Sequence, residues 1–155
     1  MTGIDTLAVL LGQHARRRDE AAAEHRQAAA ARESALAQAE QLLTYRREYE
    51  ARWRAQFARV GAMALVHCYQ GFTDRLALAI EQQGRVIEHA AARLAEACAT
   101  LREAELRCAS VQRLIERRVG EARLVADRRD QKQTDEAATR AAWARLSATR
   151  PLPLL

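Results

Sequence analysis

The sequence predicts an all-α fold, a long antiparallel two-helix coiled-coil hairpin with a C-terminal helical overhang. Three observations predict it. Of the 155 residues, 35 are alanine, whereas proline occurs twice and glycine six times. This composition favours long helices and excludes sandwiches, barrels and βαβ folds, which need frequent turns. The second observation is a heptad repeat in the second half of the chain, and the third is a stretch without charge at its middle.

The first half of the chain predicts one amphipathic helix over about residues 5–60. A thin, alanine-rich apolar stripe runs along it, and charged or histidine side chains interrupt this stripe. The stripe consists of Leu7, Leu11, Ala22, Ala29, Leu36 and Leu43, and the interruptions are His14, Arg18, His25, Arg32 and Arg46.

A break in the charge pattern separates this helix from the next. No charged residue occurs from Val60 to Thr73, and Gly61 and Gly71 bracket most of this stretch. Glycines and the loss of amphipathic pattern indicate a turn, which we place at about residues 61–68.

The second half of the chain predicts a helix over about residues 69–148. From Ile80 to Val125, alternate steps of three and four residues meet mostly apolar positions, which is the pattern of a coiled coil. The same steps then become polar and recover an apolar character at the end, at Arg129, Lys132, Glu136, Trp143 and Leu146. Pro151 ends the helix, so we expect one domain over residues 1–150 and a short tail over residues 151–155.

Antiparallel folding about this turn pairs positions whose numbers add to about 125. Tyr49 then faces Leu76, and Leu42 faces Gln83. The first helix is used up near Ala122, so residues 123–148 have no partner within the monomer that we expect. An isolated helix of that length is marginal in water, and the overhang therefore predicts a contact with another protein.

Several classes of function are excluded by what the sequence contains. The net charge of +5 is spread along the chain rather than gathered in a basic block, which argues against nucleic acid. The longest uncharged run, 14 residues, is too short to span a bilayer. Three cysteines without a CxxC pair indicate a reducing compartment, the cytoplasm. We expect no catalytic residue, no cofactor and no metal site, and hence no enzyme.

Two concentrations of residues are candidates for binding. Six of the seven aromatic residues lie between positions 45 and 72. They either lock the turn or form a docking surface. In the second case we expect one exposed patch made of Tyr45, Tyr49, Phe72 and Leu76. The second is the segment from Arg128 to Ala142, which is either a solvated helix face or a partner site.

Three segments carry a resemblance to a known family. LLTYRREYEARW (42–53), YQGFTDRLALAIEQQ (69–83) and DRRDQKQTDEAATRAA (127–142) together resemble the FliJ family of the flagellar type III export apparatus. The resemblance implies a coiled-coil stalk, similar to the stalk of rotary ATP synthases, that binds the export ATPase FliI as a ring and the cytoplasmic domain of the export gate protein FlhA. It also implies recycling of export chaperones, a role in motility, and a peripheral position at the cytoplasmic face of the inner membrane, reached through these partners.

The resemblance also implies which residues bind each partner. The export-gate surface falls on Gln38, Leu42, Tyr45, Tyr49, Phe72, Leu76, Ala79 and Gln83, of which Gln83 is not typical of the family. The ATPase-ring contact falls on Arg128, Arg129, Gln131, Lys132, Asp135 and Glu136. The main alternative is a generic coiled-coil scaffold, adaptor or homodimer without a secretion role, and it gives the aromatic residues no special value.

Overall fold

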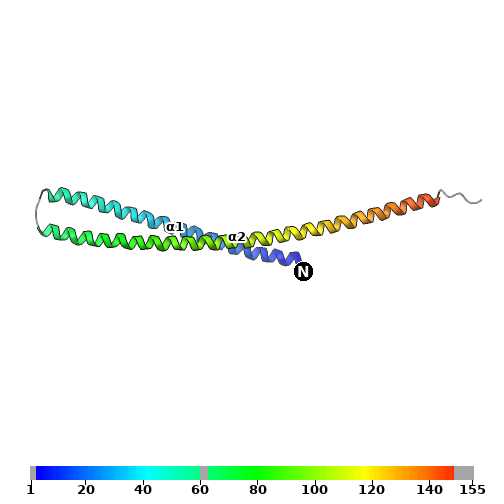
Figure 1. Ribbon diagram of the computed structural model, residues 1–155, viewed down its shortest axis with the longest axis horizontal. Coiled ribbons are helices and arrows are strands. Elements are labelled where there is room, and N and C mark those ends of the chain that lie inside the picture. The colour runs from blue at the N-terminus through cyan, green and yellow to red at the C-terminus, as the bar shows by residue number, and fades with distance from the viewer. Residues whose placement is uncertain (1–2, 60–62, 149–155) are drawn as a thin grey trace, which may run out of the picture. The chain divides into compact units, whose positions relative to one another are not determined.

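The computed structural model describes residues 3–59 and 63–148, and every regular element in this part of the chain is helical. α1 spans Gly3–Phe57 and α2 spans Met63–Ala148 (Figure 1). The prediction of an all-α helical hairpin is confirmed.

The turn between the helices is shorter and earlier than predicted. α1 ends at Phe57 and α2 begins at Met63, not near residue 69. Gly71 therefore lies inside α2, while Gly61 lies outside the described residues. Most of the charge-free stretch is thus helical, because its apolar side chains pack: Tyr69 is half-buried and contacts the rings of three residues of α1.

The described chain divides into two compact units, and each unit takes a segment of both helices. One unit holds residues 13–108, and the other holds residues 3–12 with residues 109–148. In the first unit the two helical segments run antiparallel from the turn, α1 in cyan and α2 in green (Figure 1).

Small side chains form the core of the unit of residues 13–108. Its most buried members are Ala21, Ala28, Ala35, Leu76, Ala90 and Cys108, each exposed by less than a tenth. Alanines at intervals of seven place one methyl group on the same face at every second turn of α1. The helices can therefore approach closely, but each contact buries little apolar area.

The heptad seam of α2 is confirmed from Ile80 to Ile115. Every position that the alternate steps reach in this range is buried or half-buried. Beyond it, Arg118, Ala122 and Val125 are exposed, so the tightly covered part of the seam ends earlier than its apolar pattern.

The apolar stripe predicted for α1 is displaced by one residue in its middle, whereas Leu7, Leu11 and Leu43 are half-buried as predicted. Ala21 and Ala28 are buried, whereas Ala22 and Ala29 are only half-buried and Leu36 is 41% exposed. His14, Arg18 and His25 are half-buried, so they lie along the contact face rather than outside it.

The end of α2 is a bare helix in this structure. All residues from 120 to 148 are exposed, in agreement with the prediction that α1 is used up near Ala122. Neither helix contains, within the described ranges, an apolar stretch long enough to cross a bilayer.

Candidate binding surfaces

Tyr49 is the hub of an aromatic cluster next to the turn. Its ring centroid lies 4.0 Å from that of Phe72, 5.8 Å from Trp53, 6.0 Å from Tyr69 and 6.3 Å from Tyr45. Phe72 and Tyr69 belong to α2, so these contacts join the two helices. Aromatic pairs at such distances stabilise the packing beyond their buried area.

The part of the cluster nearest the turn is packing rather than surface. Trp53 and Phe57 lie 5.2 Å apart at their ring centroids, and Tyr69 lies 5.4 Å from Trp53 and 5.7 Å from Phe57. All three side chains are half-buried. Of the two interpretations of the aromatic residues, locking of the turn therefore agrees with the structure for Trp53 and Phe57.

The predicted exposed patch is smaller than expected, and Leu76 is not part of it. Tyr45 is 47% exposed, Tyr49 and Phe72 are half-buried, and Leu76 is only 7% exposed. Leu76 lies four residues before Ile80, on the heptad steps of α2, and is one of the buried core residues. Tyr45 stacks on Tyr49 and lies 6.0 Å from Phe72, so a preformed aromatic base supports one exposed ring.

The remaining residues of the predicted gate surface continue along the same helices. Nε2 of Gln83 donates hydrogen bonds to the carbonyl oxygen of Ala35 at 2.8 Å and to Oε1 of Gln38 at 3.3 Å. Ala79 is half-buried. A groove of about 470 Å³ is lined by Gln38, Gln41, Leu42, Tyr45 and Gln83. The structure thus brings four of the eight predicted residues around one groove.

A second groove borders Tyr45 and was not predicted. It has a volume of about 430 Å³ and is lined by Ala37, Glu40, Gln41, Thr44, Tyr45 and Glu48. Its two carboxylates lie eight residues apart, two turns along the same face of α1. The spacing of the two glutamates is visible in the sequence.

The predicted ATPase contact lies on the bare end of α2. All six of its residues are exposed. Lys132, Asp135 and Glu136 line a groove of about 400 Å³ with Thr139 and Arg140. Arg140 pairs with Glu136 at 3.9 Å, a separation and exposure at which an ion pair contributes little to stability. These side chains are available to another molecule.

The same helical segment carries large exposed apolar side chains that the predicted site omitted. Their exposed fractions are 58% for Leu124, 50% for Val125, 71% for Trp143 and 67% for Leu146. Val125, Trp143 and Leu146 fall on the heptad steps, so the heptad pattern of the sequence already indicated these three positions.

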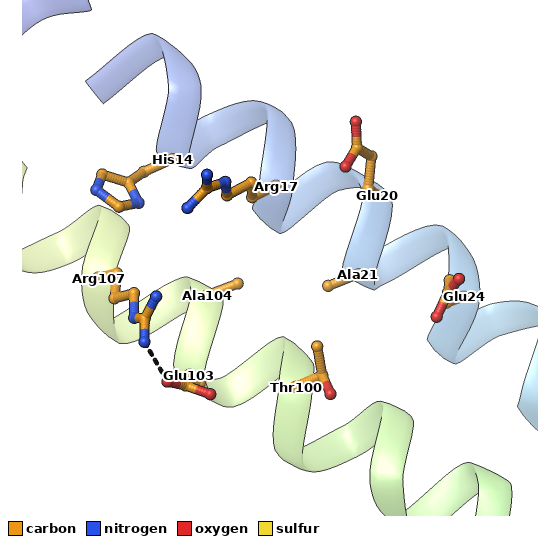
Figure 2. Close-up of a pocket in the computed structure, with 9 residues that line it drawn as sticks. All are labelled: His14, Arg17, Glu20, Ala21, Glu24, Thr100, Glu103, Ala104 and Arg107. Atoms are coloured by element: carbon orange, nitrogen blue, oxygen red, sulfur yellow. Dashed lines mark hydrogen bonds and ion pairs between the residues drawn. The ribbon is translucent and has the colours of Figure 1, made fainter. Parts of the chain in front are cut away.

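A further groove lies between the helices in the unit of residues 13–108 (Figure 2). Ala21 and Ala104 point toward one another across it, and charged side chains of both signs surround them. The groove has a volume of about 320 Å³ and is lined by His14, Arg17, Glu20, Ala21, Glu24, Thr100, Glu103, Ala104 and Arg107. Glu103 and Arg107 pair within α2, so this mixed rim has the character of a solvated helix surface.

Arg18 is half-buried and forms an ion pair with the exposed Asp19. Its guanidinium donates to Oδ1 of Asp19 at 2.9 Å, and Nη1 lies 3.9 Å from Sγ of the buried Cys108. The hydrogen bond with Asp19 and its charge raise the pKa of Arg18, which stays protonated. Cys98 is half-buried and Cys68 exposed, and the described ranges contain no group of three acidic, histidine or cysteine side chains that could hold a metal ion.

Comparison with known proteins identifies the family. The model of the family described as flagellar FliJ protein matches residues 4–147, nearly the whole chain. No curated protein and no solved structure matches. The chain therefore belongs to the flagellar FliJ protein family, and this membership supports a role in the flagellar export apparatus.

Proposed function

We propose that this protein is a coiled-coil stalk of the flagellar export apparatus that binds two partners through two different surfaces. The aromatic surface around Tyr45 binds the cytoplasmic domain of the export gate protein FlhA. The bare end of α2 binds the ring of the export ATPase FliI. Through these partners the protein is held at the cytoplasmic face of the inner membrane, and it helps to recycle export chaperones.

The observation that carries this proposal is the position of Tyr45. Tyr45 is 47% exposed although its ring stacks on that of Tyr49 and contacts that of Phe72. A ring held in this way loses little side-chain freedom on binding, so more of the contact energy appears as affinity. Exposed, rigid tyrosines of this kind are typical anchors of protein interfaces.

The end of α2 supports the second contact. From residue 120 to residue 148 the helix offers every side chain to solvent, with the apolar residues Val125 and Trp143 on either side of a polar centre. Such a helix gains stability by lying against another protein. Its mixed character suits a partner surface that is itself partly polar.

Binding of the purified FlhA cytoplasmic domain tests the first contact. We expect Tyr45→Ala to weaken binding at least tenfold, about 1.4 kcal/mol, in isothermal titration calorimetry. The control is Leu78→Ala, because Leu78 is 59% exposed on α2 but belongs to neither the cluster nor the grooves beside Tyr45. This variant should bind like the wild type.

The alternative of a generic scaffold makes a different prediction. In that case the wild-type protein does not bind the FlhA domain, or Tyr45→Ala and Leu78→Ala bind equally well. Either result would remove the aromatic surface from the function. Circular dichroism of each variant confirms that the helices remain intact.

A further inference from the structure

The seam positions at the exposed end of α2 run from apolar through polar to apolar residues. The alternate steps of three and four residues visit, in order, Ala122, Val125, Arg129, Lys132, Glu136, Thr139, Trp143 and Leu146, all of them exposed. Apolar residues lie at both ends of this seam, and a base and an acid lie at its centre. In the middle, Lys132 precedes Glu136 by one turn.

Such a seam is complementary to itself when a second copy lies antiparallel. In antiparallel coiled coils each a position faces a d position of the other helix. If positions whose numbers add to 268 face one another, Lys132 meets Glu136 of the second copy and Val125 meets Trp143 of the second copy. The two-fold axis repeats each contact, as in any isologous dimer. We propose that two copies of this chain associate through residues 122–146 in this register.

A groove in the same unit is placed to receive the second copy. It is lined by Gly3, Ile4, Leu7, Leu114, Arg118, Glu121, Ala122 and Val125, and its volume is about 660 Å³. Ala122 and Val125 are the positions that face Leu146 and Trp143 of the second copy. The two large side chains therefore meet a groove whose lining is mostly apolar and includes two charged residues, Arg118 and Glu121.

The charges select the antiparallel direction. Parallel pairing in register would oppose Lys132 to Lys132 and Glu136 to Glu136, and like charges in contact disfavour association. Antiparallel pairing forms two Lys132–Glu136 pairs instead. Arg140 holds Glu136 at 3.9 Å, which leaves this carboxylate able to accept from a second base. The antiparallel register also brings Asp135 of the two copies near one another, with Lys132 one turn away on each helix.

This association replaces the monomer expected from the hairpin alone. It does not rest on the proposed function, because the chain itself is the only component. Val125 and Trp143 cannot contact a second copy and another protein at once, so binding of a second copy and binding of another protein at this seam exclude one another.

Sedimentation velocity of the full chain, from about 1 to about 200 μM, tests the proposal. We expect reversible association to a dimer. Trp143→Ala removes one large side chain from each of two symmetric contacts and should weaken association at least about 100-fold. Leu124→Ala is the matched control, because Leu124 is 58% exposed on the same helix but faces away from the seam.

Charge reversal tests the register. Lys132→Glu opposes two acids at each central pair and should weaken association at least about tenfold, whereas the double variant Lys132→Glu with Glu136→Lys should restore it. Circular dichroism at a concentration where both chains are monomeric separates a loss of association from a loss of helix, because Lys132→Glu also places two acids at i, i+4 on one helix. A monomer at every concentration, equal effects of Trp143→Ala and Leu124→Ala, or no effect of Lys132→Glu would overturn the proposal.

Discussion

The ring centroids of Tyr49 and Phe72 lie 4.0 Å apart, and this contact joins α1 to α2 beside the turn. Tyr49 also contacts Tyr45, Trp53 and Tyr69. One half-buried side chain thus holds together the base on which the exposed Tyr45 ring rests. The neighbouring tyrosines 45 and 49, one turn apart, have different roles: the first presents a surface and the second supports it.

We expect Tyr49→Ala to destabilise the hairpin more than Tyr45→Ala does. Loss of four ring contacts should lower the free energy of unfolding by about 2 kcal/mol, since Tyr49 is only half-buried and full burial of a large aromatic side chain is worth more. Tyr45→Ala should cost less than about 1 kcal/mol. Urea unfolding followed by circular dichroism measures both, and equal losses would contradict the division of roles.

The alanines of α1 should not tolerate larger side chains. Ala28 is 5% exposed, so Ala28→Leu forces the helices apart and should lower the free energy of unfolding by about 1–3 kcal/mol. Ala30, two residues further along, is exposed. Ala30→Leu should therefore change the free energy of unfolding by less than about 0.5 kcal/mol. Thermal unfolding compares the stability of the two variants. Equal stability would mean that Ala28 does not set the spacing of the helices.

Gln83 should contribute to the stability of the hairpin through packing more than through its hydrogen bonds. Its amide donates to the Ala35 carbonyl, yet a half-buried apolar side chain at this seam position would gain by burial. We expect Gln83→Ala to lower the free energy of unfolding by about 0.5–1.5 kcal/mol and Gln83→Leu to restore it. If Gln83→Leu is as unstable as Gln83→Ala, the hydrogen bonds carry the stability.

The seam of α2 could be predicted from the sequence because its residues differ strongly from their neighbours. Ile87, Leu94 and Leu101 recur among charged residues, so only one face can be apolar. In α1 the alanines occur in adjacent runs, such as Ala21 with Ala22 and Ala28 with Ala29. Either member of each run fits a heptad, and only the packing against α2 selects the first. The middle of the stripe was therefore predicted one residue away from the core.

The turn and the binding surfaces were predictable only in part. Gly71 indicated a break, but a glycine in a long helix costs only about 1 kcal/mol, which neighbouring aromatic contacts offset. The spacing of Phe72 and Leu76 indicated one shared face, but not that the contact with α1 covers Leu76. The acidic groove beside Tyr45 depends on how the exposed side chains lie, which spacing alone does not determine.

The most direct test of two separate binding surfaces is a chain that lacks residues 123–155. The described residues of this segment are all exposed, so the truncated hairpin keeps its buried core. Stimulation of the FliI ATPase activity and binding of the FlhA cytoplasmic domain are measured side by side with the full chain. We predict loss of ATPase stimulation with gate binding unchanged, and loss of gate binding with ATPase stimulation retained would contradict the account.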